Sequence, residues 1–316
     1  MSEVKPGSSK EWALIESLLN KSVAEQRKSR RWGIFFKLLT FAYIFFALWM
    51  FSPSNWLPDK KTDFHTAVID VDGMIAASQE ASADAIVSGL RDAFESKEAK
   101  GVILRINSPG GSPVQSGFVF NEILRLKEKY PDKKVYAAIT DMGASGAYYI
   151  AAAADEIYAD PASIVGSIGV ISSGFGFSDV MGKVGIDRRI MASGDNKAML
   201  DPFSPVNPEE VEKFQVLLGV VHQQFIDSVR RGRGERLKEN KETFSGMFWT
   251  GRQALEIGLV DALGSPGYIA REVIGYEEIV DYTVRPNPFD AFAEKLGVSL
   301  GKGFAIALGV TPFSLR

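Results

Sequence analysis

The sequence contains no cysteine and only two histidines, His65 and His222, among its 316 residues. The lack of cysteine excludes disulfides, thiol nucleophiles, iron–sulfur clusters and cysteine-ligated zinc, and it leaves the redox compartment undetermined. Two histidines are too few for a histidine-rich metal site, and any catalytic triad with an imidazole base must use one of them. We therefore expect neither a metal nor a cofactor.

The sequence also has no large excess of basic or of acidic residues. The chain has 36 basic and 39 acidic residues, for a net charge of −3, which provides no electrostatic drive toward nucleic acid. Apolar residues make up 46% of the chain and charged residues 24%, which is enough for one large or two modest globular domains and argues against intrinsic disorder.

One long apolar run, residues 32–51 (WGIFFKLLTFAYIFFALWMF), carries Lys37 as its only charge. About twenty apolar residues are what a helix needs to cross the hydrocarbon core of a bilayer. Lys37 is close enough to the leading end for its side chain to reach the headgroups. We therefore predict a transmembrane anchor here rather than a buried core helix.

Basic residues flank this run unequally. Residues 21–31 contain five Lys or Arg and one Glu, whereas the ten residues after the run contain two Lys and one Asp. The positive-inside rule then predicts a cytoplasmic leader, residues 1–31, and an external location for the rest of the chain. A cleaved signal peptide has a shorter apolar region with small residues at the cut, whereas this run ends in LWMF, residues 48–51, so we expect the anchor to be retained.

After a proline-containing linker, residues 52–65, short apolar runs alternate with amphipathic segments. The apolar runs predict strands at 67–71, 101–107 and 133–140, and the segments between and after them predict helices at 83–96, 114–130 and 144–155. This repetition predicts an α/β domain with a mainly parallel sheet covered by helices on both faces.

A longer helix is predicted to begin after Asn207, with Asn207 as the cap, Pro208 in the first turn and Glu210 completing a capping box. Its apolar stripe consists of Val211, Phe214, Leu218, Val221 and Phe225. His222 borders this stripe. We interpret it, and His65 after the linker, as surface or packing residues.

Two glycine-rich loops each follow a predicted strand and precede a predicted helix, where open α/β sheets place functional groups. Residues 107–113 (NSPGGSP) are suited to an oxyanion hole or a peptide-binding rim, or form an ordinary tight turn. Residues 141–147 (DMGASGA) contain one hydroxyl, Ser145, near a helix N-terminus. A close contact between helix and sheet explains the second loop equally well.

A serine nucleophile needs a base, and the scarcity of histidine points to lysine. Burial disfavours a charged ammonium, so a lysine amine in an apolar site can act as a base. Lys197, in the loop-like segment 192–203 (ASGDNKAMLDPF), is the best candidate. Taken alone, such a lysine is typical of a protein surface.

Five blocks of the sequence, in this order, resemble the short form of bacterial signal peptide peptidase A over residues 66–282. They are NSPGG at 107–111, DMGASGAYYIAAAAD at 141–155, GSIGV at 166–170, the stretch around Lys197, and TGRQALEIGLVDALG at 250–264. The resemblance implies the fold shared by the Clp protease subunit and the crotonases, with a Ser/Lys dyad in place of a triad.

Carried over residue by residue, the resemblance implies that Ser145 is the nucleophile and Lys197 the general base. Ser167 would orient the lysine amine.

The resemblance further implies that the Gly111 and Gly146 amides bind the oxyanion, with Gly110 beside them in the substrate-binding loop. We expect apolar pocket walls, formed by NSPGG and residues 166–176.

The resemblance also implies a function. The chain would be a membrane-anchored serine endopeptidase that degrades remnant signal peptides and other apolar peptides. It would form a homo-oligomer with its sites near subunit boundaries and would bind no nucleic acid. The peptidase domain, residues 66–284, would lie on the outer side of the bacterial inner membrane, followed by a tail, residues 285–316. The alternatives are a stomatin-partner membrane protease, an inactive membrane scaffold with the same fold, and a crotonase-type hydratase, which needs acidic groups at its site.

Overall fold

The computed structural model describes residues 9–50 and 63–285. The chain divides into two units, one formed by Met1–Lys60 with Pro286–Arg316 and the other by Lys61–Arg285. Most of the predicted linker and all but the first residue of the predicted tail lie outside the described residues.

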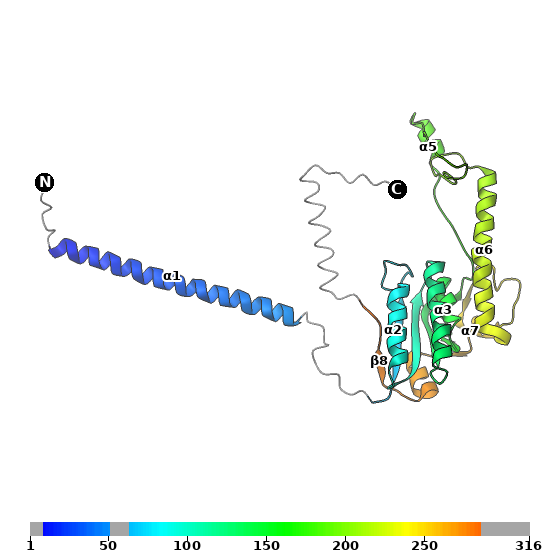
Figure 1. The fold of residues 1–316 in the computed structure, drawn as a ribbon, viewed down its shortest axis with the longest axis horizontal. Coiled ribbons are helices and arrows are strands. Elements are labelled where there is room, and N and C mark those ends of the chain that lie inside the picture. The colour runs from blue at the N-terminus through cyan, green and yellow to red at the C-terminus, as the bar shows by residue number, and fades with distance from the viewer. Residues whose placement is uncertain (1–8, 51–62, 286–316) are drawn as a thin grey trace. The chain divides into compact units, whose positions relative to one another are not determined.

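Helix α1, Ser9–Met50, is the described part of the first unit (Figure 1). The large apolar side chains that the structure describes on it are exposed, among them Phe41 and Phe45 at 72% each. Across residues 9–50 and 63–285, no helix combines the length and the apolarity that crossing a bilayer requires. The predicted transmembrane segment, residues 32–51, ends at Phe51, which lies outside the described residues.

A largely parallel sheet forms the centre of the second unit. Its main strands are β1 His65–Asp72, β2 Ala99–Ser108 and β3 Val135–Ala144. The strand order is β6-β5-β3-β2-β1-β8, with β4 pairing β3 and β7. The shorter strands are β4 Glu156–Ala159, β5 Ile164–Gly166, β6 Phe248–Thr250, β7 Ala262–Leu263 and β8 Ile279–Asp281. Only the β5–β6 pair of this sheet is antiparallel, so the predicted mainly parallel α/β architecture is confirmed.

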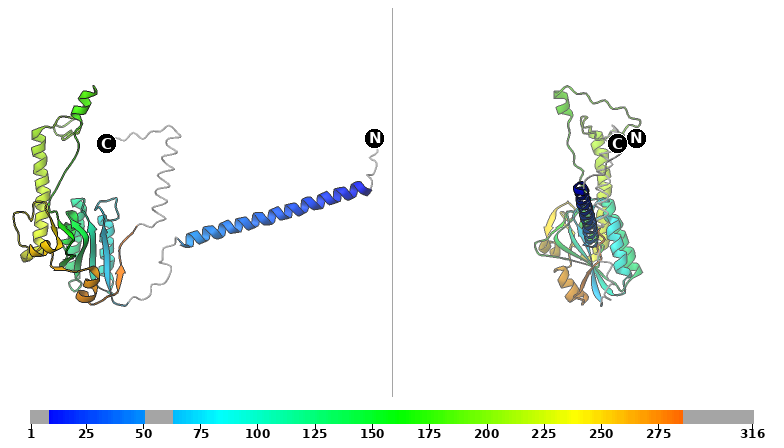
Figure 2. Two further views of the ribbon diagram at one scale, coloured as in Figure 1. Left: turned by 180° about the vertical axis from the view of Figure 1, so that it is seen from behind. Right: turned by 90° about the vertical axis from the view of Figure 1, so that its left-hand side faces the viewer.

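Alternate residues of the central strands face two different cores, because successive side chains of a strand point to opposite faces. Ile69 and Leu104 belong to the larger core, on the face of helices α2 Ala83–Glu95 and α3 Pro113–Lys129. Val68 and Ile103 belong to a smaller core on the other face. That face is covered by the short helices α8 Pro266–Tyr268 and η3 Ile269–Ile274, across the strands from α2 and α3 (Figure 2).

The end of β3 and the helix after it differ from the prediction. The strand continues to Ala144 because Met142–Ala144 pairs with β5, a short strand that the sequence pattern did not reveal. Helix α4 therefore spans only Gly146–Ala151 instead of residues 144–155.

Helix α6, Pro208–Arg233, is capped by Asn207 as predicted, since the Asn207 side chain accepts a hydrogen bond from the Glu209 N–H at 3.0 Å. The predicted capping box is wrong. The Glu210 carboxylate instead accepts the N–H of Leu200, at 3.0 Å, and so fastens the preceding loop to the helix.

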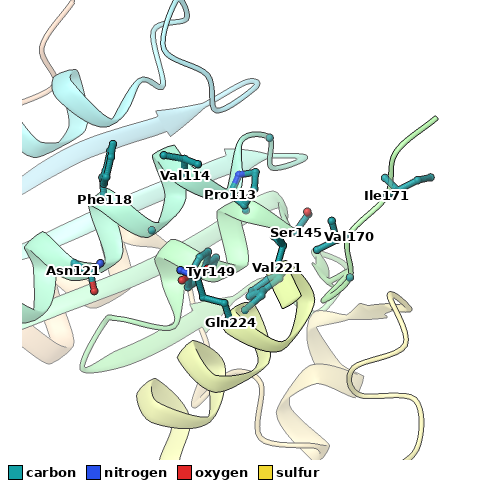
Figure 3. A pocket seen from close by; sticks show the side chains of 15 residues that line it. Pro113, Val114, Phe118, Asn121, Ser145, Tyr149, Val170, Ile171, Val221 and Gln224 are labelled. Atoms are coloured by element: carbon teal, nitrogen blue, oxygen red, sulfur yellow. The ribbon is translucent and has the colours of Figure 1, made fainter. Parts of the chain in front are cut away.

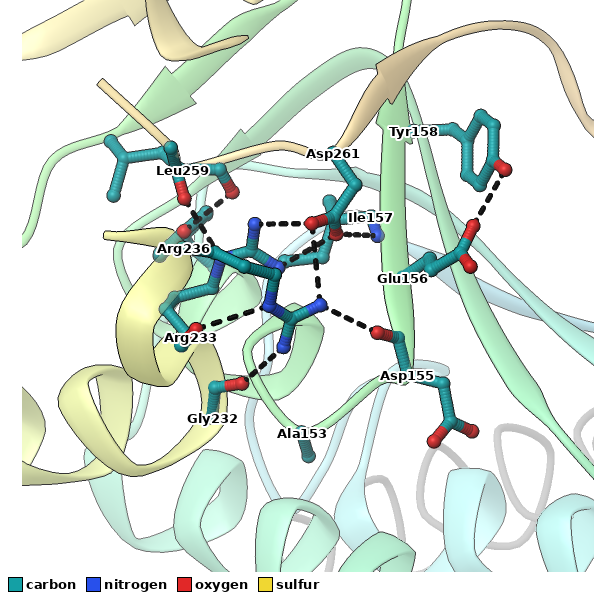
Figure 4. A network of polar contacts seen from close by, with 12 residues as sticks. Ala153, Asp155, Glu156, Ile157, Tyr158, Gly232, Arg233, Arg236, Leu259 and Asp261 are labelled. Atoms are coloured by element: carbon teal, nitrogen blue, oxygen red, sulfur yellow. Dashed lines mark hydrogen bonds and ion pairs between the residues drawn. The ribbon is translucent and has the colours of Figure 1, made fainter. Parts of the chain in front are cut away.

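An ion pair fixes the C-terminal end of α6 to the sheet (Figure 4). The Arg233 side chain is fully buried and donates to both carboxylate oxygens of Asp261 at 2.8 Å. Arg236 donates to the same carboxylate at 3.2 Å, and Asp261 also accepts the Ile157 N–H of β4 at 2.7 Å. One carboxylate thus joins α6 to the strand beside β3.

The ionisation of Asp261 contributes to this junction. Burial acts to raise the pKa of the Asp261 carboxyl. The hydrogen bond and charge of Arg233, the Ile157 N–H and the charge of Arg236 together outweigh burial and hold the pKa below its ordinary value. A lowered folded-state pKa stabilises the protein above the unfolded-state pKa, about 3.9. This contribution is lost as the pH falls through the folded-state value.

We expect Asp261→Asn to lower the free energy of unfolding by about 3 kcal/mol at neutral pH, because the buried Arg233 charge loses its counterion while the shape is kept. Urea unfolding of the full-length protein measures the loss. The difference from wild type should shrink as the pH falls below about 3.9, where the unfolded chain takes up a proton on Asp261, and should be lost below the lowered pKa of the folded carboxyl.

Glu272→Gln is the matched control, because its ion pair with Arg271 leaves both side chains about half exposed, at 50% and 51%. Water screens such a pair, so no measurable change is expected. An Asp261→Asn protein as stable as the control would show that the junction does not hold the fold.

Candidate active site

The loops after β2, β3 and β5 meet at one edge of the sheet, because these strands are parallel neighbours. Ser108 pairs with Gly143, and Ala144 pairs with Gly166. The loop after β1 joins them through a bridge between Ile75 and Gly111. The register of the sheet thus gathers the two predicted loops and the GSIGV segment at one place.

Ser145 lies in a sharp turn between β3 and α4. Its φ is 52°, a value that non-glycine residues adopt only at a steric cost. The Ser145 N–H donates to the Gly166 carbonyl oxygen at 2.8 Å, which holds the turn against the end of β5. The side chain is half-buried, and its hydroxyl makes no hydrogen bond to residues 9–50 or 63–285. It is therefore free to meet a ligand.

Two backbone N–H groups beside this turn, those of Gly111 and Gly146, have no hydrogen-bond partner among the described residues. By contrast, the Gly110 N–H donates to the Ser108 hydroxyl at 3.1 Å. A Cβ on Gly146 would lie 3.2 Å from the Gly111 nitrogen, so the two free amides are close together. Such a pair is suited to an oxygen that carries negative charge.

Gly110 permits this close approach. Its φ is 98°, and a Cβ there would lie 2.6 Å from the Gly146 nitrogen and 2.7 Å from the Ser145 Cβ. A side chain at this position would push the NSPGG loop away from the serine. Gly110 therefore acts through its lack of a side chain, and its own amide is already paired.

Ser167 lies on the segment next to Ser145. It is half-buried, has a φ of 50°, and its N–H donates to the Met247 carbonyl oxygen at 2.7 Å. The preceding Gly166 lies on the Trp249 indole, since a Cβ there would fall 2.8 Å from Trp249 Cδ1. The Trp249 Nε1–H is buried without a partner in the described part of the chain.

A cavity of about 320 Å³ adjoins Ser145 (Figure 3). Its walls come from the NSPGG loop, α3, α4, residues 169–171 and the middle of α6, and they include both expected wall segments. Among the residues that the structure describes, no acidic or basic side chain lines it. The lining residues are Gly111, Pro113, Val114, Gly117, Phe118, Asn121, Ser145, Gly146, Tyr149, Gly169, Val170, Ile171, Val221, Gln224 and Phe225.

Lys197 does not line this cavity. Its side chain is exposed, and the adjoining Asn196 accepts a hydrogen bond from Lys213, near the N-terminus of α6, at 3.1 Å. Along α6 the helix rises about 12 Å from Lys213 to Val221, the first of its residues that lines the cavity. The structure therefore brings Ser145 together with the three glycines and Ser167, but not with Lys197 of the same chain.

Some residues near the site were not singled out from the sequence. Tyr149 and Gln224 were not identified as cavity walls, and Trp249 was not connected with Gly166. The sequence predicts His222 to be a surface or packing residue. It is half-buried, with Nε2 3.1 Å from the Ile168 carbonyl oxygen, and so packs α6 against the GSIGV segment. No three acidic or histidine side chains in the described ranges are grouped so that they would hold a metal ion.

Comparison with known proteins finds one matching family model and relatives that are named as proteases. The family model described as Peptidase family S49 matches residues 127–273. A protein of Synechocystis named "Putative protease" is 36% identical over 199 residues, which cover 63% of this chain and 69% of that protein. A "Putative protease" of Methanocaldococcus jannaschii is 30% identical over 240 residues, which cover 74% of this chain and 76% of that protein.

Other similarities extend over parts of longer proteins or are weaker. A Brucella abortus protein named Na(+)/H(+) antiporter NhaA is 46% identical over 186 residues, which cover 59% of this chain, and the chain matches only 25% of that protein's length. Among solved structures, a membrane-bound stomatin-specific protease is 15% identical over 71% of this chain and 99% of its own, with a TM-score of 0.41. That score is too low to support an argument.

The positive φ of Ser145 predicts how substitutions there affect the free energy of unfolding. We expect Ser145→Gly to be more stable than Ser145→Ala by about 1 kcal/mol, because glycine adopts a positive φ without the steric cost that alanine keeps. Urea unfolding of the two full-length variants measures the difference. Both variants lack the hydroxyl, so the comparison isolates the backbone.

Ser88, exposed on α2, is the matched control. In a helix the order reverses, and Ser88→Gly should be less stable than Ser88→Ala by about 1 kcal/mol. The same order at both positions would contradict a strained turn at Ser145.

Proposed function

The chain belongs to peptidase family S49, and we propose from this that it is a serine endopeptidase with Ser145 as nucleophile and Lys197 as general base. The observation that carries the proposal is the pair of unpartnered amides, Gly111 N–H and Gly146 N–H, beside the free hydroxyl of Ser145. Backbone donors aimed at an oxygen that gains negative charge are typical of acyl transfer.

The reaction proceeds in two halves. The uncharged Lys197 amine takes the Ser145 proton as Oγ attacks the peptide carbonyl carbon, and the two amides stabilise the resulting oxyanion. The C–N bond then breaks, and the leaving amine takes the proton from the lysine. In the second half, water gives a proton to the lysine amine as its oxygen attacks the acyl-enzyme ester. The bond between the acyl carbon and Ser145 Oγ then breaks, Ser145 takes the proton from the lysine, and the carboxylic acid leaves.

The base for each Ser145 comes, in this proposal, from a neighbouring copy of the chain. Two observations support this. Lys197 is exposed beside the N-terminal half of α6, and that half contains no buried residue, since the buried residues of α6 are Phe225, Val229 and Arg233. A lysine held away from its own cavity is available to the cavity of a second copy.

A large exposed apolar surface supports the homo-oligomer. Residues 171–206 and the N-terminal half of α6 extend away from the sheet (Figure 1). Large apolar side chains there are mostly solvent-exposed, which is unusual for a monomer and typical of an interface. Examples are Ile171, Phe175, Val184, Met191, Val206 and Val216.

The substrates we propose are remnant signal peptides and other apolar peptides. The cavity beside Ser145 is mainly apolar, and none of the described residues that line it is charged, so it suits uncharged side chains. The same lining argues against a crotonase-type hydratase, which needs acidic groups at its site. The Brucella proteins named as antiporters match this chain over only 25% of their length, so their name gives no ground for ion transport by this chain.

We also propose, from the sequence, that residues 32–51 anchor the chain in the bacterial inner membrane with the peptidase domain outside. The apolar run, its single charge and the basic residues before it support this orientation. A tether at the membrane surface would bring the domain close to released signal peptides.

Ser145→Ala and Lys197→Ala should each reduce peptide hydrolysis to background, because the nucleophile and the base act as one unit. An equimolar mixture of the two variants, unfolded and refolded together, should recover about a quarter of wild-type activity, since random assembly pairs an intact serine with a neighbour's intact lysine at that frequency. Fluorogenic peptide assays measure the recovery.

Two outcomes would contradict this proposal in different ways. Background activity in the mixture, with intact oligomers, would place the dyad within one chain. Failure of wild-type Ser145 to hydrolyse peptides or react with a fluorophosphonate would favour the inactive scaffold.

The full-length chain should remain in the membrane pellet after a carbonate wash, whereas a chain lacking residues 1–51 should be released. In intact spheroplasts, added protease should digest the peptidase domain but leave a cytoplasmic control protein whole. Release of the full chain by carbonate would refute the anchor, and protection of the domain would refute the orientation.

A further inference from the structure

Gly117 lies in the interior of α3, where a glycine costs helix stability relative to alanine. Two other helix glycines have an evident packing reason. A Cβ on Gly89 would lie 2.5 Å from the Tyr282 carbonyl oxygen, and a Cβ on Gly232 would overlap the Ala152 carbonyl group. At those positions the backbones approach too closely for any side chain.

At Gly117 no close contact excludes a side chain. A Cβ there would lie 3.7 Å from the Tyr149 Oη and 3.8 Å from Tyr149 Cε1, which are ordinary van der Waals contacts. Its φ is not positive, so alanine could take the same backbone conformation. The fold therefore accepts a methyl group at this position.

The space beside Gly117 belongs instead to the cavity that adjoins Ser145. Gly117 is a lining residue together with Tyr149, and the Tyr149 ring lies against Phe225 with ring centroids 4.9 Å apart. A methyl group on Gly117 would therefore enter the cavity next to these packed aromatic rings. The absent side chain makes the cavity larger without being required by the helix.

We infer that Gly117 is a specificity-determining residue, which sets the cavity to accept a large uncharged side chain on the acyl side of the cleaved bond. This inference rests on the proposed peptidase function. Ser145, Gly111 and Gly146 line the same cavity, so the residue whose carbonyl is attacked has its side chain next to this space.

The chemistry of the walls defines the class of side chain. Val221, Phe225 and the Tyr149 ring provide apolar surface (Figure 3). The polar groups away from Ser145 are all uncharged: the amides of Asn121 and Gln224, and the Tyr149 hydroxyl, which accepts a hydrogen bond from Ser228 at 2.8 Å. A charged side chain would lose its water without gaining a counterion. The side chains of leucine, methionine and phenylalanine are both uncharged and large enough to fill this space, whereas that of alanine leaves the cavity largely empty.

The test compares full-length wild type with Gly117→Ala on peptidyl-coumarin substrates that differ only in the residue before the cleaved bond, Phe, Leu, Ala or Arg. Wild type should prefer Phe and Leu. Gly117→Ala should lower the ratio of kcat/KM for Phe over Ala about tenfold, the effect expected of one carbon in an apolar pocket. Its Tm should rise by about 2 °C, because alanine favours the helix.

Gly267→Ala is the matched control. Gly267 lies in α8, a Cβ there would have open space, and the residue does not line the cavity. The same methyl group at this position should leave the Phe over Ala ratio unchanged. A ratio that changes equally in both variants would overturn the role of Gly117.

Peptide aldehydes ending in phenylalanine or alanine separate this inference from the proposed function, because their binding is read as a Tm shift without turnover. In wild type, the phenylalanine aldehyde should raise the Tm more than the alanine aldehyde does. In Gly117→Ala, the two aldehydes should raise the Tm equally. An unchanged difference in Gly117→Ala would overturn the inference even if wild type hydrolyses peptides. If the difference is removed but Ser145 hydrolyses nothing, the proposed peptidase function fails and the role of the cavity stands.

Discussion

The backbone hydrogen bond from the Ser145 N–H to the Gly166 carbonyl oxygen joins the two segments on which the candidate site depends. It continues the parallel pairing of β3 with β5 just beyond Ala144. Ser145 directly follows β3 and is hydrogen-bonded to the end of β5, so the pairing of these two strands holds the turn in which its φ is 52°. The position of the hydroxyl thus follows from strand register rather than from a contact of its own side chain.

Helix α6 connects this site to the rest of the molecule. Its C-terminal half is fixed by Arg233 and Asp261, and that half presents Phe225 to the cavity. Its N-terminal half holds the loop of Lys197 through the contacts of Lys213 and Glu210. One rigid helix therefore builds the wall of the cavity and keeps the candidate base away from it, which is consistent with a base supplied by another copy.

Glycines contribute to the site in two distinct ways. Gly110 and Gly166 have positive φ and lie so close to neighbouring atoms that no side chain fits. Gly117 has an ordinary helical backbone and room for a methyl group, and the space it leaves open is part of the cavity. The first kind positions the backbone around Ser145, and the second leaves space for the substrate.

The sequence by itself determined the α/β class, the central strands and the loops that carry Ser145 and Gly111, because apolar periodicity and glycine-rich turns are local properties. Only the tertiary structure decided where α4 begins, because β3 continues as far as it pairs with β5. It also decided that Glu210 accepts a hydrogen bond from the loop residue Leu200 instead of completing the cap of α6. It also decided that Lys197 lies outside its own cavity. These features depend on which distant segments meet, and a local pattern contains no information about that.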